Sequence, residues 1–415
     1  MPGAVVAIIG AGQAGFQTAA SLRDSGFDGR IVLLGDEPVL PYQRPPLSKS
    51  YLAGETPIDD LWLRPVEFYA KQQIDLIYGD AVIGVDRQRR RIRLASGIEI
   101  SWDYLVFATG ARFRPLDVPG TALDGVLPLR TLADTDILRQ KLDEAGEIVV
   151  VGAGFIGLEF AAVAIARGNG VHILEITHHP MGRVVSAQTS RFFTDVHRRW
   201  GAKVLLGTGV SSIGGSGGRV TSVETTDGEH LPADLVLVCI GVISNTELAG
   251  KTGLAVDNGI VVDEHLMTAD PAIFAIGDCA NFPTPFAASR VRLESVQNAV
   301  DQGRCVAGHI TGRPELYRKV PWFWSDQGDL KLQIAGITTG HDKEVVRGDP
   351  ADGHFSIFCF HGQRLIGVES VNRPADHAVA RRLLAGDPGL SPEEAGDQDY
   401  DLRAHARRVV SPVRA

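Results

Sequence analysis

The stretch Ala-Val-Val-Ala-Ile-Ile-Gly-Ala-Gly-Gln-Ala-Gly, residues 4–15, decides the fold of this chain. Its apolar first half predicts a buried strand, and the spacing of the residues from Gln13 to Ser25 predicts a helix. The turn between them has the pattern G-x-G-x-x-G, formed by Gly10, Gly12 and Gly15. In such a turn the first glycine permits the tight bend, the second lets a pyrophosphate approach the backbone, and the third lets helix and strand pack closely. The helix N-terminus then offers N–H groups to the phosphates.

The same arrangement recurs far downstream. Glu147 to Val151 predicts a second buried strand and Leu158 to Arg167 a second helix. The glycines between them are Gly152, Gly154 and Gly157. In a chain with 47 glycines, one such match arises by chance about half a time, so a single copy is weak evidence. Two copies, each placed between a strand and a helix, predict two nucleotide sites.

An acidic residue ends the strand that follows each motif. The strand at residues 30–34 leads to Asp36 and Glu37, and the strand Gly170 to Leu174 leads to Glu175. A carboxylate about 20 residues after the glycines is suited to bind ribose hydroxyls. Glu175 accepts from a 2′-hydroxyl and repels a 2′-phosphate, and no arginine follows it until Arg183, so the sequence favours NADH over NADPH.

Three further apolar runs end in turn residues. Tyr104 to Gly110 and Leu235 to Gly241 each predict a strand that runs into a glycine turn. Ile273 to Ile276 predicts a third strand, followed by Gly277 and Asp278. Together with the two glycine motifs, these runs predict an α/β protein with two Rossmann-type domains.

The pattern changes from about residue 325. Short strands such as Phe355 to Phe360 and a helix from Ala375 to Leu384 follow, which predicts a separate C-terminal α+β domain. The stretch from Asp387 onward is rich in Pro, Gly and charge, so we expect a loosely held tail.

Length and composition narrow the class of protein. A chain of 415 residues exceeds the size of one hydrophobic core, so two or three domains are expected. The sequence has no apolar run of membrane-spanning length and no signal-peptide pattern, so we expect a cytoplasmic protein with no membrane partner. A net charge of −9 argues against nucleic acid as a partner.

The four cysteines, Cys239, Cys279, Cys305 and Cys359, are scattered along the chain. No two of them have the close spacing of a metal site or of a redox dithiol. We therefore expect buried free thiols and no bound metal.

Several segments carry a resemblance to a known family. They are Gly10–Gly15, Tyr42–Lys49, Ala108–Arg112, the second glycine motif, Ala275–Ala280, Pro321–Gln327 and Val371–Pro374. Together they resemble the FAD-dependent NADH:ferredoxin reductases of bacterial oxygenase systems, a family that includes putidaredoxin and rubredoxin reductases. The likeness extends to about residue 385.

The resemblance implies a glutathione-reductase-like fold, in which the NAD domain is inserted into the FAD domain. On this chain it implies an FAD-binding domain at 1–111 and 247–325 and an NAD-binding domain at 112–246. The C-terminal α+β domain with its flexible tail would then occupy 326–415.

The resemblance, with the glycine motifs, also implies site residues. Those expected at FAD are Gly10, Gly12, Ala14, Gly15, Asp36, Lys49, Val82, Ala108, Thr109, Gly110, Arg130, Asp278, Glu294, Val296 and Trp324. Those expected at NADH are Gly152, Gly154, Ile156, Gly157, Glu159, Glu175, Arg183 and Gly241. Lys49 and Glu159 are expected to meet beside the flavin, with Trp324 near its ring, as the catalytic residues.

Two departures from the family pattern stand near the NADH site. Ser244 replaces a proline before Asn245, which affects only the stiffness of that loop. His179 stands where an arginine is often found after the ribose-binding acid, which alters how the adenosine end of NADH is held.

The missing cysteine pair selects the electron acceptor. Disulfide reductases of this fold need a close pair of cysteines, and NADH peroxidases need one near residues 40–50. Neither is present. Electrons should therefore pass one at a time to an external carrier, and the resemblance implies an acidic [2Fe-2S] ferredoxin that serves a monooxygenase or dioxygenase. We expect a monomer or weak homodimer.

Three alternatives stay open. A rubredoxin reductase would differ only in its acceptor. The NADH-binding subunit of a nitrite reductase is disfavoured because no iron-sulfur or sirohaem ligand cysteines follow. A redox-sensing interaction protein resembling apoptosis-inducing factor would turn over slowly.

An acidic partner requires a local basic patch on this acidic chain. The resemblance places five candidates near the flavin edge: Arg290, Arg292, Arg304, Lys331 and Arg373.

Overall fold

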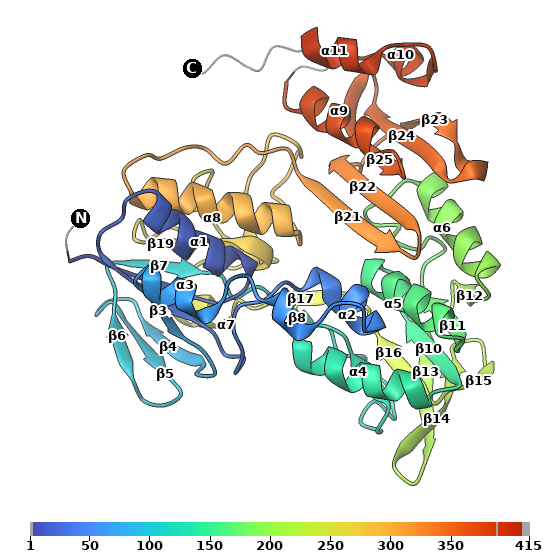
Figure 1. Ribbon diagram of the computed structural model, residues 1–415, viewed down its shortest axis with the longest axis horizontal. Helices are drawn as coiled ribbons and strands as arrows, with labels where there is room; N and C mark the ends of the chain where they lie inside the picture. Colours follow the sequence, from blue (N-terminus) through green and yellow to red (C-terminus); the bar gives the residue numbers. More distant parts are fainter. Residues whose placement is uncertain (1–2, 387–388, 409–415) are drawn as a thin grey trace. The chain divides into compact units, whose positions relative to one another are not determined.

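The first glycine motif lies at the carboxyl edge of a five-stranded parallel sheet with the order β19-β7-β1-β2-β3. The computed structural model describes residues 3–386 and 389–408 (Figure 1). The strands are β1 Val5–Ile9, β2 Arg30–Leu34, β3 Ile74–Ile77, β7 Tyr104–Phe107 and β19 Ile273–Ala275. The in-register pairing of Val5 with Arg30 places the ends of β1 and β2 side by side.

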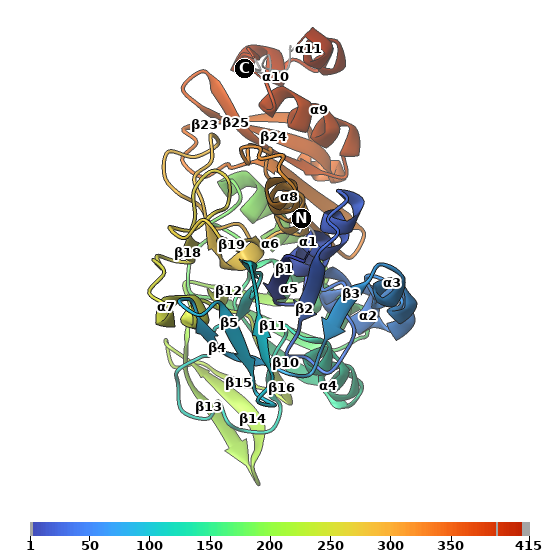
Figure 2. The same cartoon turned by 90° about the vertical axis from the view of Figure 1, so that its left-hand side faces the viewer.

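Two helices pack side by side on this sheet (Figures 1 and 2). They are α1 Gln13–Asp24, which follows the glycine motif, and α8 Val296–Ile310. Ile8 of β1, Leu22 of α1 and Val306 of α8 are fully buried in one core. Strands covered by helices are expected to be apolar along their length, and β1 is, as is β2 after its exposed first residue, Arg30.

Smaller elements complete the same part of the chain. A three-stranded antiparallel sheet has the order β4-β5-β6, and β18 pairs with β20. Their bounds are β4 Val82–Asp86, β5 Arg91–Leu94, β6 Glu99–Ser101, β18 Ile260–Val261 and β20 Ala280–Asn281. The helical elements are η2 Ile58–Leu61, α3 Val66–Lys71, α7 Glu247–Lys251 and η3 Gly277–Cys279.

The second glycine motif lies at the carboxyl edge of another five-stranded parallel sheet, with the order β12-β11-β10-β16-β9. Its strands are β9 Val126–Pro128, β10 Glu147–Val151, β11 Gly170–Glu175, β12 Lys203–Leu206 and β16 Leu235–Val238. Its helical elements are η1 Pro45–Ser48, α2 Ser50–Ala53, α4 Leu132–Glu144, α5 Phe155–Ala166 and α6 Ala187–Arg199. An antiparallel sheet adds β13 Val210–Ser216, β14 Arg219–Thr225 and β15 His230–Pro232.

The C-terminal domain is a five-stranded antiparallel sheet with the order β21-β22-β25-β24-β23. Its strands are β21 Trp322–Gln327, β22 Leu330–Gly336, β23 Lys343–Asp349, β24 His354–His361 and β25 Arg364–Val371. Its helical elements are η4 Pro350–Asp352, α9 Pro374–Leu384, α10 Pro392–Gly396 and α11 Leu402–Arg408. The predicted α+β character of this domain is confirmed.

The end of the chain differs from the expectation of a loosely held tail. Residues 389–408 contain α10 and α11, and the rest of the predicted tail lies outside the described residues. The reason is Arg347, which is buried and donates hydrogen bonds to the backbone carbonyls of Gln398 and Tyr400 at 3.0 and 2.9 Å. A guanidinium with five donors can bind several carbonyls at once, and composition does not reveal such a contact.

The chain divides into two compact units. Unit 1 contains the residues up to Gln43, Ile58–Arg112 and Ile243–Pro321. Unit 2 contains Arg44–Pro57, Phe113–Val242 and the chain from Trp322 onward. The chain leaves unit 1 in β8 Ala111–Phe113 and returns in β17 Val242–Ser244.

Most predicted elements agree with the structure. Residues 30–34 and Glu147 to Val151 form strands with the predicted bounds. The predicted helix Leu158 to Arg167 begins earlier, at Phe155, because Gly154 is its N-cap. None of the helices in residues 3–386 and 389–408 is both long and apolar enough to span a bilayer.

Candidate cofactor-binding and redox site

Two close backbone approaches shape the first glycine turn. Gly10 has φ +113°, and a Cβ on it would lie 2.1 Å from the carbonyl oxygen of Ala108. A Cβ on Gly15 would lie 1.9 Å from the carbonyl oxygen of Gly10. No side chain fits at either position, so both glycines are required for β1, β7 and α1 to meet as they do.

The second turn repeats this geometry. Gly152 has φ +102°, and its Cβ would lie 2.4 Å from the carbonyl oxygen of Cys239. A Cβ on Gly157 would lie 2.2 Å from the carbonyl oxygen of Gly152. The two units therefore contain the same strand-turn-helix device.

The middle glycine of each turn is different. A Cβ on Gly12 or on Gly154 would meet nothing within 4 Å, and both residues have φ near −75°. Each is the N-cap of a 12-residue helix and makes no side-chain cap hydrogen bond. A ligand phosphate therefore has room beside the N-cap of α1 and of α5, where the helix dipole favours an anion. Both turns thus fit the pyrophosphate of a dinucleotide.

The two acids after β2 have different surroundings. The hydroxyl of Tyr42 donates to Glu37 Oε2 at 2.7 Å. Asp36 is exposed at the end of the strand. The carboxylate with room to accept from a ribose is therefore that of Asp36.

Glu175 is fixed against the second glycine turn. Its Oε2 accepts from the backbone N–H of Ala153 at 2.9 Å. Its Oε1 accepts from the backbone N–H and the hydroxyl of Thr177 at 2.9 and 2.8 Å. These bonds hold the carboxylate at the mouth of the turn, as expected for a ribose acceptor.

The structure brings two other predicted NADH residues together. Arg183 Nη2 lies 3.6 Å from the position of a Cβ on Gly241. Gly241 lies three residues after the end of β16 and has φ +99°, a conformation that glycine adopts without strain. Ile156 lies in the first turn of α5 and is half-buried.

In unit 1, α1 is packed closely against the segment that carries Asp278. A Cβ on Gly277 would lie 3.1 Å from the Cβ of Ala14, and one on Gly303 would lie 3.1 Å from the carbonyl oxygen of Ala14. Gln302 Oε1 accepts from the N–H of Gly277 at 2.7 Å. Small residues at these positions let Asp278 lie close to the first glycine turn.

Arg292 joins two other predicted residues. Its Nη1 lies 2.6 Å from Glu294 Oε1 and donates to the carbonyl of Asp278 at 3.2 Å. The Arg292 side chain is only 11% exposed. The expectation that Arg292 contributes to an exposed docking patch is therefore wrong, because its guanidinium is used inside unit 1.

The turn after β7 is closed by Asn245. The hydroxyl of Thr109 donates to the carbonyl of Asn245 at 2.6 Å, and Asn245 Nδ2 donates to the carbonyl of Thr109 at 2.9 Å. Gly110 follows with φ +63°. The remaining unit 1 predictions lie at the start of elements, Val82 in β4 and Val296 in α8.

Lys49 and Glu159 meet, although they are 110 residues apart in the sequence. Lys49 Nζ lies 2.6 Å from Glu159 Oε2, and the Glu159 side chain is 4% exposed. The hydroxyls of Ser48 and Ser325 donate to the two oxygens of Glu159 at 2.5 and 2.7 Å. A buried carboxylate requires such partners, and this one has a cation and two hydroxyls.

Trp324 precedes Ser325, the residue whose hydroxyl donates to Glu159. It is half-buried, and its ring centroid is 5.6 Å from that of Trp322 and 6.4 Å from that of Phe323. Phe323 in turn packs on Phe155, the first residue of α5, at 4.6 Å. Arg130 also belongs to unit 2, where its carbonyl accepts from Arg44 at 2.8 Å.

The four cysteines are all free thiols, and two of them are buried. Burial raises the pKa of the Cys239 thiol to about 12 and that of Cys305 to about 11. Burial also raises the pKa of Cys279 and of Cys359. Thiols with such values stay protonated near neutral pH and are poor nucleophiles. Within the described residues no group of three or more His, Cys, Asp or Glu is arranged to hold a metal ion.

Three supporting residues were missed by the sequence analysis: Ser48, Ser325 and Gln302. Ser48 and Ser325 lie inside segments that carried the family resemblance, beside Lys49 and Trp324, so their position was a usable signal. Gln302 lies in the middle of α8 and had no signal, because its role depends on how α8 packs.

The remaining four candidates for the docking patch differ in whether their charged groups already bond within the protein or are exposed to a partner. Arg290 donates to the carbonyl of Asn281 at 2.7 Å, and Arg373 lies 2.7 Å from Asp376. Lys331 is exposed, and the Arg304 side chain is 62% exposed with a loose contact of 3.4 Å to Asp301.

Comparison with known proteins agrees with this geometry. Residues 4–303 match the pyridine nucleotide-disulphide oxidoreductase family, and residues 322–406 match the reductase C-terminal domain. The chain is 51% identical to rhodocoxin reductase of Rhodococcus erythropolis over 398 residues, which are 96% of this chain and 93% of that protein.

Two solved structures are similar over nearly their whole length. The ferredoxin reductase for the CYP199A2 system from Rhodopseudomonas palustris is 49% identical, with a TM-score of 0.95 over 97% of this chain and 99% of that one. Putidaredoxin reductase in its covalent complex with putidaredoxin is 39% identical, with a TM-score of 0.95 over 99% of both chains. The predicted glutathione-reductase-like fold is confirmed.

The middle glycines generate a prediction. Gly12→Ala and Gly154→Ala should both fold, because the added methyl meets no protein atom within 4 Å. Gly12→Ala should lower FAD affinity by about tenfold or more, since the methyl occupies the pyrophosphate position. Gly154→Ala should retain FAD and raise the KM for NADH by about tenfold. FAD absorbance per chain after dialysis and steady-state kinetics measure both effects.

Gly250→Ala in α7 is the matched control, because its Cβ would make an ordinary contact at 3.8 Å. It should change neither affinity. Normal FAD binding by a folded Gly12→Ala variant would rule out this turn as the FAD pyrophosphate site.

Proposed function

Because this chain belongs to the pyridine nucleotide-disulphide oxidoreductase family and carries its reductase C-terminal domain, we propose that it passes electrons from NADH through FAD to a [2Fe-2S] ferredoxin. The observation that carries the proposal is a pair of dinucleotide turns in a chain whose only four cysteines are free thiols. Such a chain is an oxidoreductase with two cofactor sites and no dithiol of its own to reduce.

The cofactors are assigned from the two turns. We assign FAD to 1–111 and 247–321 and NADH to 112–246. The C-terminal domain begins at Trp322 and not at the expected residue 326, because β21 belongs to its sheet. Bound FAD would supply the chemistry of accepting a hydride and releasing electrons singly. The residues of unit 1 proposed to hold it are the first glycine turn, Asp36 at the ribose and Asp278 beside α1.

The Lys49–Glu159 pair is proposed to act as the charged part of the redox site. Glu159 fixes the Lys49 ammonium, which also donates to the carbonyl of Pro45 at 3.2 Å. A positive charge held in one place favours the binding of an electron-rich group and costs no reorganisation when that group arrives. Ser48 and Ser325 keep Glu159 in the orientation that this requires.

The acceptor is proposed from the close relatives. The similar structures include a ferredoxin reductase of an oxygenase system and a reductase bound covalently to putidaredoxin. Relatives of about equal length with these acceptors support a ferredoxin for this chain. A rubredoxin stays as the second candidate, and a slow-turnover interaction protein as the third.

The surroundings of Glu175 predict a preference for NADH. The wild-type protein should use NADH far better than NADPH, because a fixed carboxylate repels a 2′-phosphate. Glu175→Arg should narrow or reverse this preference. Glu175→Gln, which keeps the shape and removes the charge, should narrow it by about tenfold. The measurement is the ratio of kcat/KM for NADH to kcat/KM for NADPH, with ferricyanide as the electron acceptor, in the wild type and in each variant.

Glu144→Arg, at the end of α4 with a side chain 69% exposed, makes the same charge change away from the glycine turn. It should leave the preference unchanged. Equal kcat/KM values for NADH and NADPH in the wild type would contradict the role given to Glu175.

A [2Fe-2S] ferredoxin should be a faster electron acceptor for this chain than a rubredoxin. Cytochrome reduction by NADH should be fast when a [2Fe-2S] ferredoxin is present and slow with rubredoxin. Arg304→Glu should lower the ferredoxin-dependent rate by about threefold to tenfold at low salt, because steering charges act mainly on association. High salt should reduce this difference.

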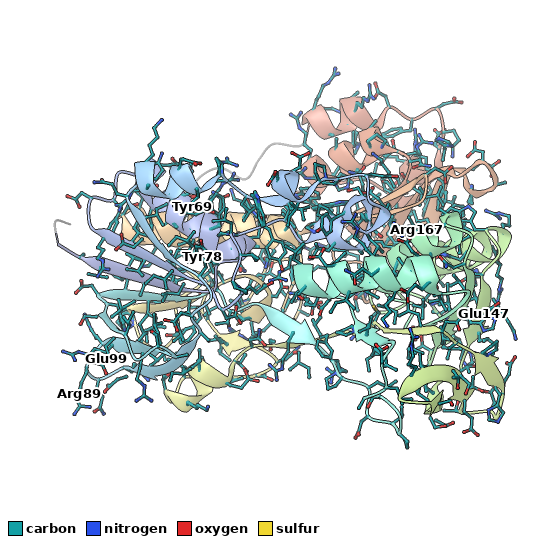
Figure 3. The ribbon with its side chains drawn as sticks, turned by 60° about the horizontal axis from the view of Figure 1, so that its bottom comes forward. Tyr69, Tyr78, Arg89, Glu99, Glu147 and Arg167 are labelled. Carbon is teal, nitrogen blue, oxygen red and sulfur yellow. The ribbon has the colours of Figure 1, made fainter. Side chains whose placement is uncertain are left out.

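Arg89→Glu is the matched control, because Arg89 is also exposed and also lies three residues from an aspartate, Asp86 (Figure 3). It stands on the β4–β5 turn and should have no effect. Faster turnover with rubredoxin than with ferredoxin would identify rubredoxin as the acceptor. Equal rates with and without either carrier would instead favour a redox-sensing interaction protein that turns over slowly.

A further inference from the structure

The segment 176–186 joins Glu175 to α6 and carries Arg183, so it forms one side of the proposed NADH site. Its Met181 has φ +55°, an uncommon conformation for a residue with a side chain, and donates its N–H to the carbonyl of Ala153 in the second glycine turn at 3.0 Å. Such a conformation persists only where the surroundings hold it.

The C-terminal domain provides those surroundings. The hydroxyl of Thr338 donates to the carbonyl of Val184 at 2.8 Å, and the hydroxyl of Thr339 donates to the carbonyl of Arg183 at 3.2 Å. The two threonines lie two and three residues after the end of β22 at Gly336. The C-terminal domain therefore holds two successive backbone carbonyls of the segment, those of Arg183 and Val184.

Two carboxylates of the same domain hold the end of the segment. Glu369 of β25 accepts from the backbone N–H and from the hydroxyl of Ser186, both at 2.7 Å. Glu344 of β23 accepts from the N–H of Ala187 at 3.2 Å. Ser186 is the N-cap of α6, so both carboxylates lie at a helix N-terminus, which favours negative charge.

A third strand, β21, contacts the middle of the segment. Gln327 of β21 donates to the sulfur of Met181 at 3.7 Å, and its Oε1 lies 2.9 Å from Nε2 of the buried His197 in α6. Residues of β21, β23 and β25 therefore contact 181–187 together with the threonines after β22.

The surroundings of Glu369 show how firmly it holds the end of segment 176–186 in place. It is fully buried, and no cation among the described residues lies within ion-pair distance of it. Burial raises the pKa of the Glu369 carboxyl, and the side chains of Thr189 and Thr338 oppose that shift together with the two Ser186 groups. If the segment moved away, this buried carboxyl would lose the N–H and the hydroxyl of Ser186, and a buried acceptor without its donors is unfavourable. The segment is therefore held in one position.

We propose that Thr338, Thr339 and Glu369 are positioning residues for the NADH site, and that the C-terminal domain thereby sets the affinity of the protein for NADH. The inference rests on the proposed function, because it assumes that 176–186 contacts the nicotinamide cofactor. The C-terminal domain would then take part in binding the electron donor, NADH.

The test removes the two hydroxyls with little change in shape. Thr338→Val/Thr339→Val should raise the KM for NADH and the Kd for NAD⁺ by about threefold to tenfold. The FAD content, and kcat with ferricyanide at saturating NADH, should stay as in the wild type. Thr338→Ser/Thr339→Ser keeps both hydroxyls and should restore the KM.

Glu369→Gln is the second variant and should raise the KM in the same direction. Ser356→Ala is the matched control, because Ser356 is a buried residue of the same sheet whose hydroxyl bonds to Ser370 and Asp376 and not to the segment. It should lower the melting temperature and leave the KM unchanged.

An unchanged KM in a folded double valine variant, or equal KM values for the valine and serine pairs, would overturn the proposal. If Glu369→Gln does not fold, the valine and serine pairs still decide. Failure of NADH to reduce the wild-type flavin would instead contradict the proposed function.

Discussion

The structure depends on the close approach of backbone to backbone at two strand-to-helix turns. At Gly10 and again at Gly152 a Cβ would lie 2.1 and 2.4 Å from a carbonyl of the neighbouring strand. Only glycine permits that approach. It brings the N-termini of α1 and α5 to the carboxyl edges of their sheets, with the open positions of Gly12 and Gly154 above them. The two cofactor sites are consequences of this single constraint, used twice.

Buried carboxylates organise the rest of unit 2. Glu159 holds Lys49 with help from Ser325 of the C-terminal domain, and Glu369 of that domain holds Ser186. Each is costly to bury and is stable only with its donors in place. The C-terminal domain thus supplies partners to both the charged pair and the segment after Glu175. Its sheet therefore positions Glu159 and Ser186, which are distant from it in the sequence.

The local features were predictable because they depend on neighbours in the sequence. The strands at 30–34 and 147–151 were predicted with their bounds, since a buried parallel strand is a continuous apolar run. Lys49 and Glu159 were paired only through the family resemblance. Gln302 and Glu369 could not be found, because their partners are set by tertiary packing and a single polar residue gives no pattern. The same reason applies to Arg347, which gives order to residues predicted to form a loose tail.

The central claim is that the flavin is the only redox group of the chain and that no thiol stores electrons. All four cysteines are free, and burial raises the pKa of each. An anaerobic reductive titration of the FAD-loaded protein, followed by flavin absorbance, counts the electrons that the chain can hold. The account predicts two electrons per FAD. A capacity of four electrons per FAD would show a reducible disulfide and would contradict it.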